Sequence, residues 1–218
     1  MNYLQHNKEL HGTLYKPEEP VIFTKADSAL LKSGKPFFVP DWAARVDYEA
    51  EVVVRICRLG KGIPVRFAHR YYDAVTVGID FTARDWQEKA RKDGLPWTIC
   101  KGFDGSAAIG EWVEVGELSR IGDEGGKGDE EGNGDKGGKG VQDLHFRLDL
   151  DGRTVQQGHT ADMLYTVDEL IAYISRFFTL RTGDILFTGT PAGVGPVEEN
   201  NHLEGWLEER KVADFWCK

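Results

Sequence analysis

The sequence predicts a β-rich, mixed α/β fold built from many short strands and few helices. Short segments rich in Val, Ile and other apolar residues recur along the chain, whereas only two segments have a pattern typical of helices. These segments do not alternate regularly, as strands and helices do in a doubly wound parallel sheet. The 218 residues fit one domain, residues 1–218, which is long enough to bury a substantial core.

The predicted strands are short apolar runs that end at turn signals. They comprise residues 48–56, 74–79, 109–115, 144–150 and 185–188. Asp151-Gly152 is a tight-turn pair, so we expect the strand 144–150 to continue into a hairpin.

The two predicted helices differ in character. Residues 82–92 are polar and end near Gly94. The second helix starts at Thr166 and Glu169, which have the spacing of a capping box. Its apolar residues recur at helical spacing: Leu170, Ile171, Ile174 and Phe177.

Residues 122–140 differ in composition from the rest of the chain, because nearly all are Gly, Asp, Glu or Lys. Such a segment buries too little apolar surface to offset its ordering entropy, so we expect a flexible surface loop. A calcium loop of the EF-hand type is excluded. Counting from Asp129, its twelfth position falls on Gly140, where a bidentate Glu is required.

Composition excludes several classes of partner. The net charge is −9 and no basic stripe is present, which excludes a nucleic-acid partner. No apolar run approaches the roughly 18 residues that cross a bilayer, and the N-terminus lacks the apolar core of a secretion signal. The three cysteines are widely separated and odd in number, which favours small buried or half-buried side chains in a reducing cytoplasm.

Three carboxylates follow or interrupt apolar strand segments. Glu49 and Glu51 are two residues apart in a predicted strand, so their side chains project from the same face. Asp80 follows the predicted strand 74–79. Convergence of the three groups would suit Mg²⁺, which prefers oxygen ligands. A solvated polar face is the alternative interpretation of the same spacing.

Further polar residues follow Asp80. Arg84 and Gln87 lie three residues apart on one face of the predicted helix, and Arg84 could orient a substrate carboxylate or pair with Glu88. Lys101 lies where an apolar stretch meets a glycine, which suits a substrate ligand or a lysine that extends along the surface.

Residues 187–196 run from a strand into a loop rich in Gly and Pro. The segment lacks the GxxxxGK[ST] arrangement of a phosphate loop. The Thr190 hydroxyl and the backbone amides beside it could bind a carboxylate or could belong to an ordinary tight turn.

Four segments together resemble the fumarylacetoacetate hydrolase family, and in particular its short, single-domain, acylpyruvase-like branch. They are Asp47-Tyr-Glu49-Ala-Glu51-Val-Val-Val, Gly78-Ile-Asp80-Phe-Thr-Ala-Arg84-Asp-Trp-Gln87, Gly94-Leu-Pro-Trp97-x3-Lys101-Gly-Phe-Asp104 and Gly183-Asp-Ile-Leu-Phe-Thr-Gly-Thr-Pro191. The resemblance implies the C-terminal-domain fold of that family, a mixed β-sandwich roll with few helices. It covers residues 2–120 and 141–218, and the insertion-like run at 122–140 lies outside it.

The resemblance also implies roles for these residues. Glu49, Glu51 and Asp80 would bind Mg²⁺ or Mn²⁺ as the cofactor. Lys101 and Thr190 would hold the oxo-acid end of a small substrate, and Lys101 would also be a catalytic residue. Arg84 and Gln87 match positions that line the pocket and would bind the substrate.

The N-terminal segment resembles the lid motif of the family, in which His6 and Glu9 activate water. An exposed, fraying terminal helix is the alternative, because chain ends are often poorly ordered. The family usually has a short apolar strand and a glycine before the Asn2-Tyr3 pair, and both are missing here. We therefore expect the lid to be weakly anchored.

The implied activity is metal-dependent hydrolysis of a carbon–carbon bond in acylpyruvates or fumarylpyruvate, with release of pyruvate. Decarboxylation of oxaloacetate and isomerisation of an oxo diacid are alternatives on the same metal site. The resemblance further implies a homodimer.

Two other classes of protein are disfavoured. The first is a non-catalytic binding protein, which has no need of three converging acids. A 2-His-1-carboxylate iron oxygenase is disfavoured because no histidine pairs locally with an acid in that pattern.

Overall fold

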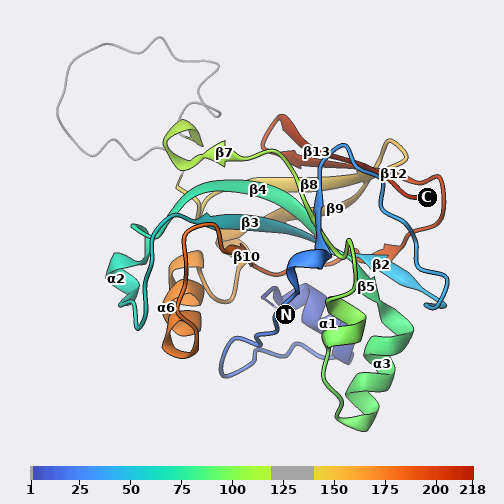
Figure 1. Cartoon of the computed structure of the whole chain (residues 1–218), viewed down its shortest axis with the longest axis horizontal. Helices are drawn as coiled ribbons and strands as arrows, with labels where there is room; N and C mark the ends of the chain where they lie inside the picture. Colours follow the sequence, from blue (N-terminus) through green and yellow to red (C-terminus); the bar gives the residue numbers. More distant parts are fainter. Residues whose placement is uncertain (1, 119–139) are drawn as a thin grey trace.

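The two central strands of the molecule, β3 (Ala50–Ile56) and β4 (Tyr72–Asp80), form an antiparallel pair in a mixed sheet. The computed structural model describes residues 2–118 and 140–218 (Figure 1). The strand order is β1-β6-β4-β3-β10, with β7 also paired to β4. The other strands are β1 (Leu30–Lys32), β6 (Ala107–Ile109), β7 (Val113–Glu114) and β10 (Ile185–Phe187). Nearly every residue of β3 is buried, which explains its continuous apolar run.

A second, four-stranded antiparallel sheet covers one face of the β3–β4 pair (Figure 1). Its order is β13 (Arg210–Trp216), β12 (His202–Leu207), β8 (His145–Leu150) and β9 (Arg153–His159). Burial alternates along β12, so one face of this sheet packs on the core and the other contacts solvent. At Gly205 a Cβ atom would lie 3.0 Å from Val77 Cγ1, which shows how closely the two sheets approach.

A third, small sheet has the order β11 (Gly195–Pro196), β2 (Val46–Tyr48) and β5 (Thr82–Ala83). It lies where β3 begins and β4 ends, next to helix α3 (Figure 1). The segments that carry the predicted site residues therefore meet at this end of the molecule.

The α-helices of the described residues are few and short. They are α1 (Leu4–His11), α2 (Val65–Ala68), α3 (Arg84–Asp93), α4 (Thr98–Lys101) and α6 (Val167–Phe177). Single 3₁₀ turns are formed by Asp27–Ala29, Val115–Glu117 and Thr160–Asp162. Within residues 2–118 and 140–218, none of the helices has the length and apolarity that a bilayer span requires.

The predicted fold class is confirmed, since the chain forms a strand-rich mixed α/β structure. The capping box at the start of α6 is present, with reciprocal bonds between Thr166 and Glu169. Asp151 and Gly152 both have positive φ angles, as the hairpin turn between β8 and β9 requires. Of the three cysteines, Cys57 is half-buried while Cys100 and Cys217 are buried, and all are free.

Three predicted element boundaries are wrong. The strand 48–56 is interrupted at Glu49, which separates β2 from β3. The helix 82–92 begins two residues later, because residues 82–83 pair with β2 instead. The strand 109–115 is divided into β6 and β7, since Glu111 leaves the sheet and donates its N–H to Val212 O at 2.6 Å. The predicted loop 122–140 lies outside the described residues, except for Gly140.

Candidate metal centre

Three buried carboxylates meet where β2, β3 and β4 adjoin. Glu49 precedes β3, Glu51 is its second residue and Asp80 is the last residue of β4. The Asp80 N–H donates to Glu49 O at 2.8 Å, so the antiparallel pairing brings these residues side by side. One oxygen from each carboxylate lies within 4.8 Å of the others, and the three residues are at most 5% exposed. The alternative of a solvated polar face is therefore wrong.

Two lysines contact this cluster. Lys101 is 2% exposed, and its Nζ donates to Glu49 Oε2 at 2.7 Å and to Asp80 Oδ2 at 2.6 Å. It also donates to Thr82 Oγ1 at 2.6 Å. Lys25 Nζ lies 2.6 Å from Asp80 Oδ1 and donates to the backbone oxygen of Lys101. Lys101 is thus part of the site and does not extend along the surface.

Arg84 connects the cluster to the start of α3. Its Nε donates to Asp47 Oδ2 and its Nη2 to Glu49 Oε1, each at 2.8 Å. Its Nη1 donates to Gln87 Oε1 at 2.6 Å. The side chain is buried, so the surface pair with Glu88 considered above is not formed. Arg84 and Gln87 lie at the site, where Arg84 holds Glu49 in place.

The pKa values of the two glutamates move in opposite directions. Burial raises the pKa of Glu49, but the charges of Lys101 and Arg84 outweigh this effect and hold it well below its ordinary value. Burial together with the charges of Asp80 and Glu49 raises the pKa of Glu51 to about 8. At neutral pH, Glu51 is therefore protonated when no cation neutralises it.

The donor set fits a hard divalent cation. All three groups offer carboxylate oxygens, which Mg²⁺ and Mn²⁺ prefer. Within the two described stretches of the chain, no lysine or arginine lies within ion-pair distance of Glu51. A divalent cation would supply the positive charge that Glu51 lacks and would displace its proton.

Helix α1 lies at the same end of the molecule. His6 is 2% exposed, and its Nδ1 lies 3.4 Å from Glu9 Oε2. Glu9 is half-exposed, and its Oε1 accepts the Gly193 N–H at 2.9 Å. Burial lowers the pKa of His6, against the opposing charges of Glu49 and Glu9. The interpretation of His6 as an exposed residue of a fraying helix is wrong.

The start of α1 is held by contacts with distant segments. The Asn2 side chain donates to Tyr165 O at 2.8 Å and to Thr188 O at 2.9 Å, and it accepts the Tyr165 N–H at 2.8 Å. Tyr3 is buried and its ring packs edge-on against Phe146. The expectation of a weakly anchored lid is therefore wrong, because Asn2 and Tyr3 supply the anchor.

Thr190 lies in the loop between β10 and β11. The preceding residue, Gly189, donates its N–H to Glu51 Oε2 at 2.6 Å. Thr190 is 1% exposed, and its Oγ1 accepts a bond from Gln156 Nε2 at 2.9 Å. Thr190 therefore lies next to the carboxylate cluster, because its neighbour Gly189 binds Glu51.

Sequence reasoning missed three polar residues of this region: Lys25, Asp47 and Gln156. Asp47 could have been found, because it shares the two-residue alternation of Glu49 and Glu51. Lys25 lies outside regular helix and strand, and Gln156 lies on β9 of the second sheet. Neither residue belongs to a local sequence pattern that would identify it as part of the site.

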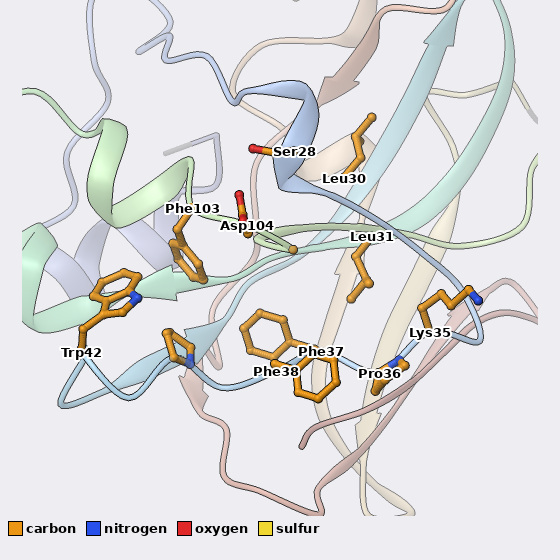
Figure 2. A pocket seen from close by; sticks show the side chains of 12 residues that line it. Ser28, Leu30, Leu31, Lys35, Pro36, Phe37, Phe38, Trp42, Phe103 and Asp104 are labelled. Atoms are coloured by element: carbon orange, nitrogen blue, oxygen red, sulfur yellow. The ribbon is translucent and has the colours of Figure 1, made fainter.

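A separate, open groove with a volume of about 730 Å³ is lined mainly by apolar side chains (Figure 2). Its lining includes the aromatic side chains of Phe37, Phe38, Trp42 and Phe103. None of the predicted site residues lines it. Phe37 stacks on the buried Phe81, the residue after Asp80, with the ring centroids 3.7 Å apart.

The strand-rich fold and its three buried carboxylates define a domain with a candidate site for a divalent metal. The chain belongs to the fumarylacetoacetate hydrolase family, because the family model described as fumarylacetoacetate (FAA) hydrolase C-terminal matches residues 1–216.

Its relatives include enzymes with different activities. Oxaloacetate tautomerase FAHD1, mitochondrial, of Mus musculus is 32% identical over 207 residues, which cover 95% of this chain and 84% of the relative. The crystal structure of fumarylpyruvate hydrolase from Pseudomonas aeruginosa, in complex with Mn²⁺ and pyruvate, has a TM-score of 0.84 at 30% identity. That match covers 99% of this chain and 85% of the other.

A third relative is an isomerase. The structure of 5-carboxymethyl-2-hydroxymuconate delta-isomerase from Mycobacterium smegmatis has a TM-score of 0.77 at 28% identity, covering 100% of this chain and 75% of the other. Enzymes of this family thus include a hydrolase, a tautomerase and an isomerase.

Proposed function

We propose that the chain is a single-domain, divalent-metal-dependent hydrolase that cleaves a carbon–carbon bond in acylpyruvates or fumarylpyruvate and releases pyruvate. The observation that carries this proposal is the buried His6, whose Nδ1 lies 3.4 Å from Glu9 Oε2 and which is close enough to the carboxylate cluster to be affected by the charge of Glu49. A base of this kind is required when water is the nucleophile. The similarity to a fumarylpyruvate hydrolase that binds Mn²⁺ and pyruvate supports the same assignment.

The side chains divide into metal ligands and substrate ligands. Glu49, Glu51 and Asp80 would hold Mg²⁺ or Mn²⁺. When bound, the cation would stabilise the negative charge that develops on the oxo-acid oxygens as the carbon–carbon bond breaks. Thr190 would donate to the oxo-acid end, and Lys101, whose three N–H groups already bond Glu49, Asp80 and Thr82, would hold that end by its positive charge. Arg84 and Gln87 would line the pocket and keep Glu49 in place.

His6 has the geometry of a general base. Its Nδ1 faces Glu9, so this nitrogen carries the proton and Nε2 is left to accept one. The burial that lowers the pKa of His6 keeps the ring neutral at neutral pH. Nε2 would take a proton from the water that attacks the distal carbonyl carbon. The same proton would then pass to the carbon that leaves as pyruvate, so that water and acylpyruvate give a carboxylic acid and pyruvate.

A second candidate function is tautomerisation or decarboxylation of oxaloacetate, or isomerisation of a related oxo diacid. The similarity to an oxaloacetate tautomerase and to an isomerase favours it. These reactions consume no water, so they depend on the carboxylate cluster and its cation more than on His6.

One experiment distinguishes the two. Purified protein is assayed with Mg²⁺ or Mn²⁺ against a panel of acylpyruvates, fumarylpyruvate and both tautomers of oxaloacetate, by ultraviolet absorbance and by product identification. The proposed function predicts release of a carboxylic acid and pyruvate. Turnover of oxaloacetate alone would assign the second function, and no turnover of any oxo acid would contradict both.

We also propose a homodimer, with the aromatic groove of Figure 2 as its contact. Phe38 is 71% exposed, which is unusual for so large an apolar side chain, and Leu30 and Trp42 are also exposed. Lys35 and Asp104 line the same groove and would pair across a two-fold axis. Light scattering should give a dimer for the parent and a monomer for Phe38→Glu.

The three free cysteines favour the cytoplasm, which we propose as the compartment. Fractionation of cells that express the tagged chain tests this assignment.

A further inference from the structure

Gln156 is a buried amide on β9, a strand of the sheet that carries none of the predicted metal ligands. Its exposed fraction is 2%. Its Oε1 accepts the Ala50 N–H at 2.8 Å, and its Nε2 donates to Thr190 Oγ1 at 2.9 Å and to Pro191 O at 3.0 Å. One side chain therefore bridges the start of β3 and the loop between β10 and β11.

A β-bulge turns Gln156 towards the site. Thr154 pairs with Asp149 and Gln156 pairs with Leu148, so Val155 is an extra residue on β9. Because side chains alternate along a strand, a regular β9 would direct residue 156 to the same exposed face as Thr154. The extra residue reverses the alternation and buries the amide.

The orientation of this amide is determined by its neighbours. The Ala50 N–H can only donate and the Pro191 carbonyl can only accept, so Oε1 faces Ala50 and Nε2 faces Pro191. Nε2 also faces Thr190, whose Oγ1 must therefore accept. The hydroxyl proton of Thr190 is directed away from Gln156 and is available for another acceptor.

We propose that Gln156 is a positioning residue that makes the Thr190 hydroxyl a hydrogen-bond donor towards the oxo-acid substrate. This inference rests on the proposed function, in which Thr190 is a substrate ligand. Ala50 lies between Glu49 and Glu51, so the same amide also sets the distance between the substrate donor and the carboxylate cluster.

The variant Gln156→Glu tests this role with little change in shape. One of its oxygens still accepts the Ala50 N–H, but the other accepts the Thr190 proton and turns the hydroxyl away from the substrate. Because a hydrogen bond to a charged group is lost, KM for the best oxo acid should rise roughly ten- to a hundredfold. We expect kcat to change much less, and Mn²⁺ affinity, measured by calorimetry, to be retained.

Three comparisons make the result specific. Gln157→Glu, at the neighbouring exposed position, should leave KM unchanged. Thr190→Val should raise KM as Gln156→Glu does. The double variant should be no worse than either single one, because both remove the same hydrogen bond. If Gln156→Glu does not fold, the shorter, neutral Gln156→Asn is measured by the same assays.

The outcomes separate the inference from the proposed function. If Thr190→Val raises KM but folded Gln156 variants do not, the positioning role is overturned and the proposed function stands. A loss of Mn²⁺ affinity as large as the rise in KM would reveal a general structural role and would also overturn it. If Thr190→Val leaves KM unchanged, Thr190 is not a substrate ligand and the positioning role of Gln156 fails with that assignment, while turnover of the oxo-acid panel still decides the proposed function.

Discussion

The Gly189 N–H donates to Glu51 Oε2 over 2.6 Å, and this bond joins the loop between β10 and β11 to the carboxylate cluster. It opposes the rise in the Glu51 pKa caused by burial and by the charges of Asp80 and Glu49, but it does not cancel that rise. Glu51 is consequently the carboxylate whose charge depends most on a bound cation. The affinity for a cation should therefore depend on the protonation of Glu51.

The affinity for Mn²⁺ should increase with pH up to about 8, the pKa of Glu51. Below this value the cation must displace a proton, so the affinity should fall by about tenfold for each pH unit. Above it the carboxyl is already ionised and the affinity should level off. Calorimetric titrations between pH 6 and 9 measure this dependence, and an affinity that stays constant between pH 6 and 8 would contradict it.

Turnover should require the metal and the charge of Glu51. A chelator should abolish activity, and Mg²⁺ or Mn²⁺ should restore it. Glu51→Gln keeps the size of the side chain but removes a ligand charge, and it should lower metal affinity by at least about tenfold. The fold should be retained, because the neutral amide replaces a carboxyl group that is already protonated at neutral pH when no cation is bound.

The matched control is Glu204→Gln. Glu204 belongs to a second group of possible metal ligands, with His202 and Asp214, but that group is half-exposed and Lys211 already donates to both carboxylates. Metal-dependent turnover should be unchanged in this variant. Equal losses in the two variants would mean that Glu51 has no special role.

His6→Ala should depress hydrolysis of acylpyruvates by about 10²–10⁴-fold while metal affinity is retained. Glu9→Ala should be milder, since Glu9 orients the ring without contacting the substrate. Burial lowers the pKa of His6, so kcat/KM should fall with decreasing pH only below the ordinary histidine value. Steady-state rates from pH 5 to 8 measure both effects. Unchanged hydrolysis in His6→Ala would mean that His6 is not the base that activates water.

Arg84→Met should destabilise the protein by about 3 kcal/mol, because it leaves Asp47 and Glu49 buried with fewer partners. Arg45 contacts the same Asp47 but is 52% exposed. Arg45→Met should therefore cost less than about 1 kcal/mol. Denaturant unfolding of both variants gives the two free energies. Similar losses of unfolding free energy in Arg84→Met and Arg45→Met would contradict the prediction that the buried ion pairs of Arg84 contribute more to stability than the exposed pair of Arg45.

Local patterns in the sequence were sufficient for much of the fold. The apolar runs of β3 and β4, the turn at Asp151 and the capping box at Thr166 depend on residues close together in the chain. The errors came where distant segments compete for a strand. Glu111 leaves the sheet for Val212, and residues 82–83 pair with β2 rather than starting α3.

The sequence by itself determined which residue types stand at the candidate site, because the alternation of Glu49 and Glu51 and the strand end at Asp80 are local features. Only the tertiary structure decided their state and their partners. The raised pKa of Glu51 depends on burial and on charges from another strand. Gln156 reaches Ala50 and Thr190 from a separate sheet, across 106 and 34 residues of sequence. Local spacing cannot encode such contacts, because they form only when the two sheets pack.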